Sequence, residues 1–195
     1  DTRAAILGTE VAALDRGGTE LVASAPAAGS SMTAFAQLLE TRATAAVDRA
    51  YDATGPDTIA KILFTSGSTD LPKGVINTQR MLCSNQQMIA QIWPSLGERP
   101  PVIVDWLPWN HTFGANHTFN MVAYRGGPLS IGEGNPAPGL IDRTIANLRE
   151  VSPTVYFNVP RGYAMLIHHL ERDATLRERF FSDLRLLFYA GAGLP

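Results

Sequence analysis

The stretch from Phe64 to Val75 reads Phe-Thr-Ser-Gly-Ser-Thr-Asp-Leu-Pro-Lys-Gly-Val and extends the short β-type run Ile62 to Phe64. It combines four hydroxyl-bearing residues, two glycines and one lysine. Glycine lets the backbone approach a ligand closely, and hydroxyl groups, backbone N–H groups and a lysine ammonium all donate to phosphate oxygens. The stretch therefore predicts a loop that holds a polyphosphate.

The same stretch could also be a flexible turn or a Walker phosphate loop. A flexible Ser/Gly/Thr turn between two strands has the same composition. The Walker phosphate loop has the pattern Gly-x-x-x-x-Gly-Lys-Ser/Thr and opens directly into a helix. Here Gly67 and Gly74 are seven residues apart, and Lys73 precedes the second glycine. The ordered Pro-Lys-Gly favours phosphate binding over a plain turn, and the residues from Gly74 onward favour a second strand.

The composition narrows the class of protein. The chain has 195 residues, of which 45% are apolar and 17% are charged, as in ordinary soluble globular domains. The formal net charge of −2 gives no reason to expect nucleic acid or a membrane surface as a partner. Cys83 is the only cysteine, so a reducing cytoplasm fits best. No apolar run approaches the ~20 residues that cross a bilayer. The oligomeric state stays open.

Short apolar strands alternate with amphipathic helices along the chain. We expect strands at 59–64, 74–76, 102–104, 154–157 and 184–189, and helices at 34–40, 78–93, 116–124, 141–148 and 163–170. This alternation predicts an α/β layered domain with a largely parallel sheet flanked by helices.

Two of the expected helices carry more detailed predictions. Thr33 precedes the first helix and is expected to cap it through its side-chain oxygen. In the helix over 78–93, an apolar stripe at helical spacing is expected to face the core. Its members are Met81, Leu82, Met88, Ile89 and Ile92. Cys83 lies in the same helix and is expected to be a buried, inert thiol.

Two further motifs give the chain a family resemblance. They are Trp109 to Gly114, Trp-Asn-His-Thr-Phe-Gly, and Ala190 to Gly193, Ala-Gly-Ala-Gly. With the loop, they make the chain resemble the adenylate-forming superfamily of acyl- and aryl-CoA synthetases, luciferases and peptide-synthetase adenylation domains. Within it, segments 75–81, 105–114 and 152–160 look most like feruloyl-CoA synthases.

The resemblance implies a domain organisation. Residues 1–195 would be a fragment of the N-terminal ATP- and acid-binding domain, in which 59–195 carries the motifs and 1–58 is a weakly placed lead-in. The family's C-terminal domain would be absent. The segments that hold magnesium and ribose, and the catalytic lysine, lie in the family beyond the position of Pro195. We therefore expect no turnover from this fragment alone.

The activity implied by the resemblance is ATP-dependent acid–CoA ligation. A carboxylate attacks the α-phosphate of MgATP to give an acyl-adenylate and pyrophosphate, and the thiol of CoA then displaces AMP. The partners would be a small carboxylic acid, ATP and CoA. Two other functions stay open: a non-catalytic nucleotide-binding module, and an enzyme that adenylates a fatty or amino acid for a carrier-protein thiol. A P-loop phosphotransferase is a more distant third.

The resemblance also assigns site residues. The phosphate-binding residues would be Thr65, Ser66, Gly67, Ser68, Thr69, Lys73 and Gly74. The acid-substrate pocket would include Trp109, His111, Phe113 and Val159, and the adenine would lie on Gly191, Ala192 and Gly193. Most members of the family have glycine at the position of Asp70. A carboxylate at this position would face the phosphates, which puts the affinity for the nucleotide in question.

The remaining histidines are expected to be structural. These are His117, His168 and His169. His111 and His117 are six residues apart, which exceeds the one-turn spacing of a helical zinc pair, and there is no second cysteine. The sequence therefore predicts no metal site among them.

Overall fold

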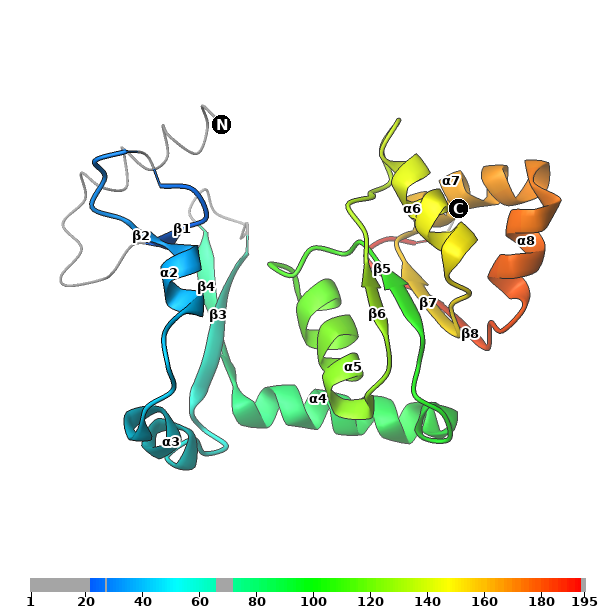
Figure 1. The fold of residues 1–195 in the computed structure, drawn as a ribbon. Helices are drawn as coiled ribbons and strands as arrows, with labels where there is room; N and C mark the ends of the chain where they lie inside the picture. Colours follow the sequence, from blue (N-terminus) through cyan, green and yellow to red (C-terminus); the bar gives the residue numbers. More distant parts are fainter. Residues whose placement is uncertain (1–21, 27, 66–71, 194–195) are drawn as a thin grey trace. The chain divides into compact units, whose positions relative to one another are not determined.

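The computed structural model describes residues 22–26, 28–65 and 72–193, and the chain divides into two units, Asp1–Thr54 and Gly55–Pro195 (Figure 1). In the first unit, β1 (Val22–Ala23) pairs in parallel with β2 (Thr33–Ala34), and α2 (Phe35–Leu39) and α3 (Ala45–Asp52) follow. The N-cap of α2 is Ala34, so the predicted cap at Thr33 is wrong by one residue. The side chain of Gln37 instead accepts the N–H of Ala34 at 3.2 Å.

The second unit begins with an antiparallel hairpin of β3 (Ile59–Thr65) and β4 (Lys73–Thr78). The two predicted strands are thus confirmed, and the pair Thr65 and Lys73 ends the ladder. A Cβ at Gly74 would lie 3.0 Å from Cγ2 of Ile62, so a side chain there would press on the opposite strand. The segment from Ser66 to Leu71 lies outside the described residues.

Helix α4 (Gln79–Ile92) follows directly from the hairpin. Thr78 caps it by accepting the N–H of Met81 at 3.4 Å. The helix forms where it was predicted, but its apolar stripe does not face the core. Met81, Met88 and Ile92 are between 54% and 70% exposed, and Ile89 alone of the stripe is buried.

The prediction that Cys83 is buried is also wrong, because its thiol is exposed. Packing buries α4 only at Gln86 and Ile89, in the later part of the helix. Cys83 precedes that part, so the described residues leave it uncovered.

Four parallel strands form the centre of the second unit. β5 (Ile103–Asp105) pairs with β6 (Leu129–Ile131), and β7 (Val155–Asn158) pairs with β8 (Leu186–Tyr189). The carbonyl of Val102 accepts the N–H groups of Thr154 and Val155 at 3.0 and 3.4 Å, which sets β5 beside β7. The spatial order is therefore β6-β5-β7-β8 (Figure 1). This confirms a largely parallel arrangement, with the hairpin as its antiparallel exception.

Helices cover both faces of these strands. The other helices among the described residues are η1 (Pro94–Gly97), the π-helix η2 (Phe113–Phe119), α5 (Asn120–Arg125), α6 (Ile141–Glu150), α7 (Pro160–Arg172) and α8 (Ala174–Phe181). Tyr156 packs in one buried cluster with residues of α6, α7 and α8, and Phe157 packs in another with Met121 of α5. Successive strand side chains point to opposite faces, so β7 is buried on both sides. The α/β layered prediction is confirmed.

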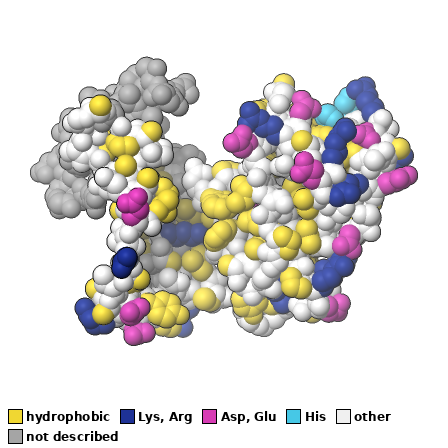
Figure 2. All heavy atoms as spheres, viewed as in Figure 1, with side chains coloured by type: hydrophobic (Ala, Val, Ile, Leu, Met, Phe, Trp, Pro, Cys, Tyr) yellow, Lys and Arg dark blue, Asp and Glu magenta, His cyan; other side chains and the backbone are white. Residues whose placement is uncertain are grey.

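Charges are mixed on the visible surface. In the view of Figure 2, basic and acidic side chains alternate over the part of the molecule that carries α6, α7 and α8. Among the residues that the structure describes, no helix is both long enough and apolar enough to span a bilayer.

Candidate functional site

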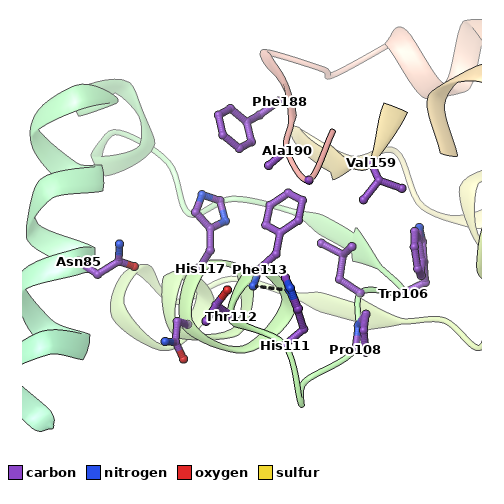
Figure 3. A pocket seen from close by; sticks show the side chains of 13 residues that line it. Asn85, Trp106, Pro108, His111, Thr112, Phe113, His117, Val159, Phe188 and Ala190 are labelled. Atoms are coloured by element: carbon purple, nitrogen blue, oxygen red, sulfur yellow. Dashed lines mark hydrogen bonds between the residues drawn. The ribbon is translucent and has the colours of Figure 1, made fainter. Parts of the chain in front are cut away.

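A pocket of about 730 Å³ opens at the carboxyl ends of β5, β7 and β8 (Figure 3). Ligands in open α/β sheets bind at this edge, because the loops that follow parallel strands converge there. The pocket is lined by Asn85, Trp106, Leu107, Pro108, His111, Thr112, Phe113, Asn116, His117, Val159, Phe188, Ala190 and Gly191.

The backbone next to the pocket makes a close approach at Gly114, which directly follows the lining residue Phe113. A Cβ added at Gly114 would lie 2.5 Å from the carbonyl oxygen of Pro108 and 2.7 Å from that of Leu107. Only glycine lets η2 pack directly on the segment that leaves β5. This packing brings His111 and Phe113 to the pocket.

His111 lies at the exposed rim of the pocket. Its Nδ1 accepts the backbone N–H of Phe113 at 3.2 Å, the contact drawn as a dashed line in Figure 3. A neutral imidazole that accepts at Nδ1 carries its proton on Nε2. In that tautomer, Nε2 of His111 is a hydrogen-bond donor.

His117 lies deeper, among aromatic rings. Its ring centroid is 4.7 Å from that of Phe157, edge to face, and 5.6 Å from that of Phe188, stacked. Burial lowers the pKa of His117 to about 4, so the imidazole is neutral at pH 7. Its Nδ1 has no hydrogen-bond partner among the described residues.

His117 was predicted to be structural, and the structure places it on the pocket wall. The sequence contained one usable signal. Phe113 and His117 are four residues apart in a helical stretch, so they share a face, and their ring centroids are 5.4 Å apart.

A network of buried amides lies behind the pocket, and the sequence did not reveal it. Asn116 Nδ2 donates to Asn77 Oδ1 at 2.7 Å, which connects η2 with β4. Gln86 Nε2 donates to the carbonyl of Asn116 at 2.8 Å, which connects η2 with α4. The three residues are distant in sequence, so no local pattern indicates the network.

Trp109 stands apart from the other predicted acid-pocket residues. It is 46% exposed, packs on Phe119 with ring centroids 4.8 Å apart, and does not line the larger pocket. It lines a separate hollow of about 300 Å³ with Asp105 and Ile131. Burial raises the pKa of Asp105 to about 6, while its carboxylate accepts the N–H of Leu107 at 2.9 Å.

The predicted nucleotide-binding residues are only partly described. Thr65, Lys73 and Gly74 are exposed at the open end of the hairpin, while Ser66, Gly67, Ser68 and Thr69, with Asp70, lie outside the described residues. Gly191 lines the pocket with φ of 94°, a conformation that favours glycine. Ala192 and Gly193 do not line it. No group of three metal-ligating side chains occurs among the described residues.

Comparisons with known proteins agree with this architecture. Residues 5–195 match the family model of the AMP-binding enzymes. The peroxisomal long chain acyl-CoA synthetase 6 of Arabidopsis thaliana is 31% identical over 134 residues, covering 65% of this chain and 18% of the relative. The medium-chain-fatty-acid–[acyl-carrier-protein] ligase TtuA of Teredinibacter turnerae is 41% identical over 59 residues, covering 30% of this chain and 9% of the relative.

A solved structure matches as well. A malonyl-CoA ligase with methylmalonyl-CoA and AMP bound superposes with a TM-score of 0.59 at 27% identity, covering 72% of this chain and 29% of the other. The chain spans less than a fifth of the length of the two curated relatives above. Because the family model matches almost the whole chain, this protein belongs to the AMP-binding enzyme family.

Proposed function

We propose that the full-length protein is an ATP-dependent acid–CoA ligase that activates an aromatic carboxylic acid, such as ferulate, and acts in the cytoplasm. The observation that supports it most is the pocket beside His111: it is lined by no Asp, Glu, Lys or Arg, it is walled by aromatic rings, and Nδ1 of His111 is occupied by the N–H of Phe113. Its volume of about 730 Å³ falls in the range of small-molecule sites.

The pocket walls suit a flat apolar group. Phe113, Phe188 and His117 present rings that pack edge to face or in parallel on one another, as aromatic pairs prefer. The imidazole of His117 is neutral at pH 7, so it offers no positive charge to an anionic group. It can exchange a hydrogen bond with an uncharged ring substituent, for which a hydroxyl or methoxy group is suitable.

His111 is positioned for the acid group itself. Its Nε2–H can donate to a carboxylate oxygen, because Nδ1 is already occupied by the N–H of Phe113. In the first step, a carboxylate oxygen forms a bond to the α-phosphorus of ATP. The bond from that phosphorus to the bridging oxygen breaks, and pyrophosphate leaves with the electron pair.

The hairpin would hold the leaving group. Lys73 places a positive charge opposite Thr65 at the open end of the ladder, where pyrophosphate oxygens need neutralisation. Mg²⁺ would enter with ATP as part of the substrate, and the described residues gather no ligand set for it. In the second step the CoA thiol attacks the acyl carbon, and AMP leaves.

A second candidate function is supported by the relatives. TtuA is named as a ligase of medium-chain fatty acids to an acyl-carrier protein, and the Arabidopsis thaliana relative as a long chain acyl-CoA synthetase. An alkyl chain would also fit an apolar pocket. The full-length protein would then adenylate a fatty acid and pass it to a carrier-protein thiol.

Acid-dependent exchange of labelled pyrophosphate into ATP tests both functions. The full-length protein would be assayed with ferulate, 4-hydroxybenzoate, octanoate and dodecanoate, and then for thioester formation with CoA or a carrier protein. We expect the aromatic acids to exchange fastest and CoA to be the acceptor. Faster exchange with the alkyl acids would favour the second function. No exchange with any acid would favour a non-catalytic nucleotide-binding module.

A further inference from the structure

One side chain is buried in the described part of the hairpin that carries Lys73. Of the described residues in β3 and β4, only Asn77 is buried, at 7% exposed, and the others are half-buried or exposed. Most buried polar atoms in proteins have hydrogen-bond partners. The partners of Asn77 therefore show what the hairpin is fastened to.

Both polar atoms of the Asn77 side chain are occupied. Nδ2 donates to the carbonyl of Val75 at 3.0 Å, and Oδ1 accepts from Asn116 Nδ2 at 2.7 Å. Because the amide nitrogen is held by its own strand, the oxygen must face η2. Exchanging the two atoms would set Asn77 Nδ2 against Asn116 Nδ2, two donors with no acceptor between them.

Asn116 is held from its other side as well. Its backbone carbonyl accepts Gln86 Nε2 at 2.8 Å, and Gln86 is 4% exposed. Asn116 also lines the pocket, between Phe113 and His117 in the sequence of η2. The bond to Asn77 thus ends on the helix that shapes the pocket.

The other bonds at the base of the hairpin lead elsewhere. Gln79 N–H donates to the Thr58 carbonyl at 3.0 Å, and Arg80 pairs with Asp57 at 3.0 Å. These contacts fasten the hairpin to the first turn of α4, which contains no buried residue. Among the side-chain hydrogen bonds of the described residues of β3 and β4, only the one that Asn77 accepts from Asn116 reaches η2.

We propose that Asn77 is a positioning residue for adenylate formation. By holding Asn116, it sets the strand that carries Lys73 in register with the pocket that would hold the acid. This rests on the proposed function, because the register matters only if a carboxylate in the pocket must reach a phosphate held by the hairpin.

The expected effect follows from the geometry of displacement. Reacting atoms must approach to about 3–3.5 Å, and a shift of about 1 Å can cost about 100-fold in rate. Lys73 lies four residues from Asn77 along β4, about 13 Å at about 3.3 Å per residue. A small rotation of the strand about Asn77 therefore produces a larger displacement at Lys73.

The test uses the full-length protein and acid-dependent pyrophosphate exchange, with rates normalised to active sites. Asn77→Leu removes the bond at similar volume, and Asn77→Ala gives the same test if the leucine variant does not fold. We expect kcat to fall by about 10- to 100-fold, while KM for the acid and Kd for ATP change by less than about threefold. Asn120→Leu, an amide on α5 outside the larger pocket, is the matched control and should stay within about threefold of wild type.

A double-mutant cycle separates positioning from general destabilisation. If the bond carries the effect, Asn77→Leu should add nothing to the loss already caused by Asn116→Leu. If the losses in kcat of the two single variants multiply in the double variant, the inference is overturned. It is also overturned if kcat is unchanged in both Asn77 variants. Either result leaves the proposed function intact. A wild-type protein without acid-dependent exchange would instead overturn the proposed function, and the positioning role with it.

Discussion

The pocket and the hairpin belong to the same unit of the chain but are held in place differently. The pocket wall is built on buried side chains, such as Phe157 at 1% exposed, and on backbone that a Cβ at Gly114 would disrupt. The hairpin exposes apolar side chains on both strands, with Phe64 at 71% and Ile76 at 51%. The pocket therefore keeps its geometry through its own packing, whereas the hairpin depends on a few directed bonds.

The difference matches the two chemical tasks proposed above. Recognition of a flat acid requires a fixed shape, which dense packing supplies. Holding pyrophosphate requires charge and donors, which an exposed strand end such as Lys73 can present. The contrast leads to predictions in which the same kind of substitution has unequal effects in the two regions.

The largest expected effect is at the open end of the hairpin. Lys73→Ala in the full-length protein should lower kcat/KM for ATP in the exchange assay by about 100-fold or more. The substitution removes the positive charge that would neutralise the leaving pyrophosphate. Lys61→Ala, a lysine on the neighbouring strand, is the matched control and should change it by less than about threefold. Equal losses in both variants would show that Lys73 acts only through net charge.

The next effect is on the stability of the pocket. Gly114→Ala places a Cβ within 2.7 Å of two carbonyl oxygens, so it should lower the free energy of unfolding by about 1–3 kcal/mol. Gly55→Ala is the control, because nothing lies within 4 Å of its added Cβ. Denaturant titration of both variants measures the difference, and equal midpoints would contradict a tight backbone approach at Gly114.

The titration of His117 tests whether the pocket interior is apolar. Burial lowers its pKa from 6.5 to about 4 in the folded protein. The neutral ring therefore contributes stability that is present above pH 6.5 and is lost as the pH falls through about 4. The NMR signal of the His117 ring can be assigned because it disappears in the His117→Phe variant. Its chemical shift should titrate near pH 4. A midpoint near 6.5 would show a solvated ring.

The smallest expected effect compares one substitution in both regions. Val75→Thr in the exposed hairpin should change the free energy of unfolding by less than about 0.5 kcal/mol. Val155→Thr, at a position with no exposed surface, should cost about 1–3 kcal/mol because it buries a hydroxyl group in an apolar cluster. A costly Val75→Thr would mean that the hairpin is covered in the full-length protein.

Local patterns were sufficient to predict most of the fold. Thr78 and the periodicity after it predicted where α4 begins, and the apolar run at 154–157 predicted β7. Periodicity shows which helix face is apolar but not what covers it, so the exposure of Met88 could not be predicted. The strand β6 and the helix α3 were not predicted, and neither contains a buried residue whose apolar pattern would mark it.

The family resemblance predicted an acid pocket from Trp109, His111, Phe113 and Val159. Three of these residues line one pocket and Trp109 does not, while their role in binding an acid stays a prediction. The position of His117 on the pocket wall depends on its contacts with Phe157 of β7 and Phe188 of β8. These residues lie about 40 and 70 residues further along the chain. The bond from Asn77 to Asn116 spans 39 residues, and no local signal marks either partner.

A crystal structure of the full-length protein with a non-hydrolysable feruloyl-adenylate analogue would test the central claim directly. We expect the aromatic ring to lie against Phe113, Phe188 and His117, with the acyl oxygen within hydrogen-bonding distance of His111 Nε2. A ring bound outside this pocket, with His111 turned away from the acyl group, would contradict it.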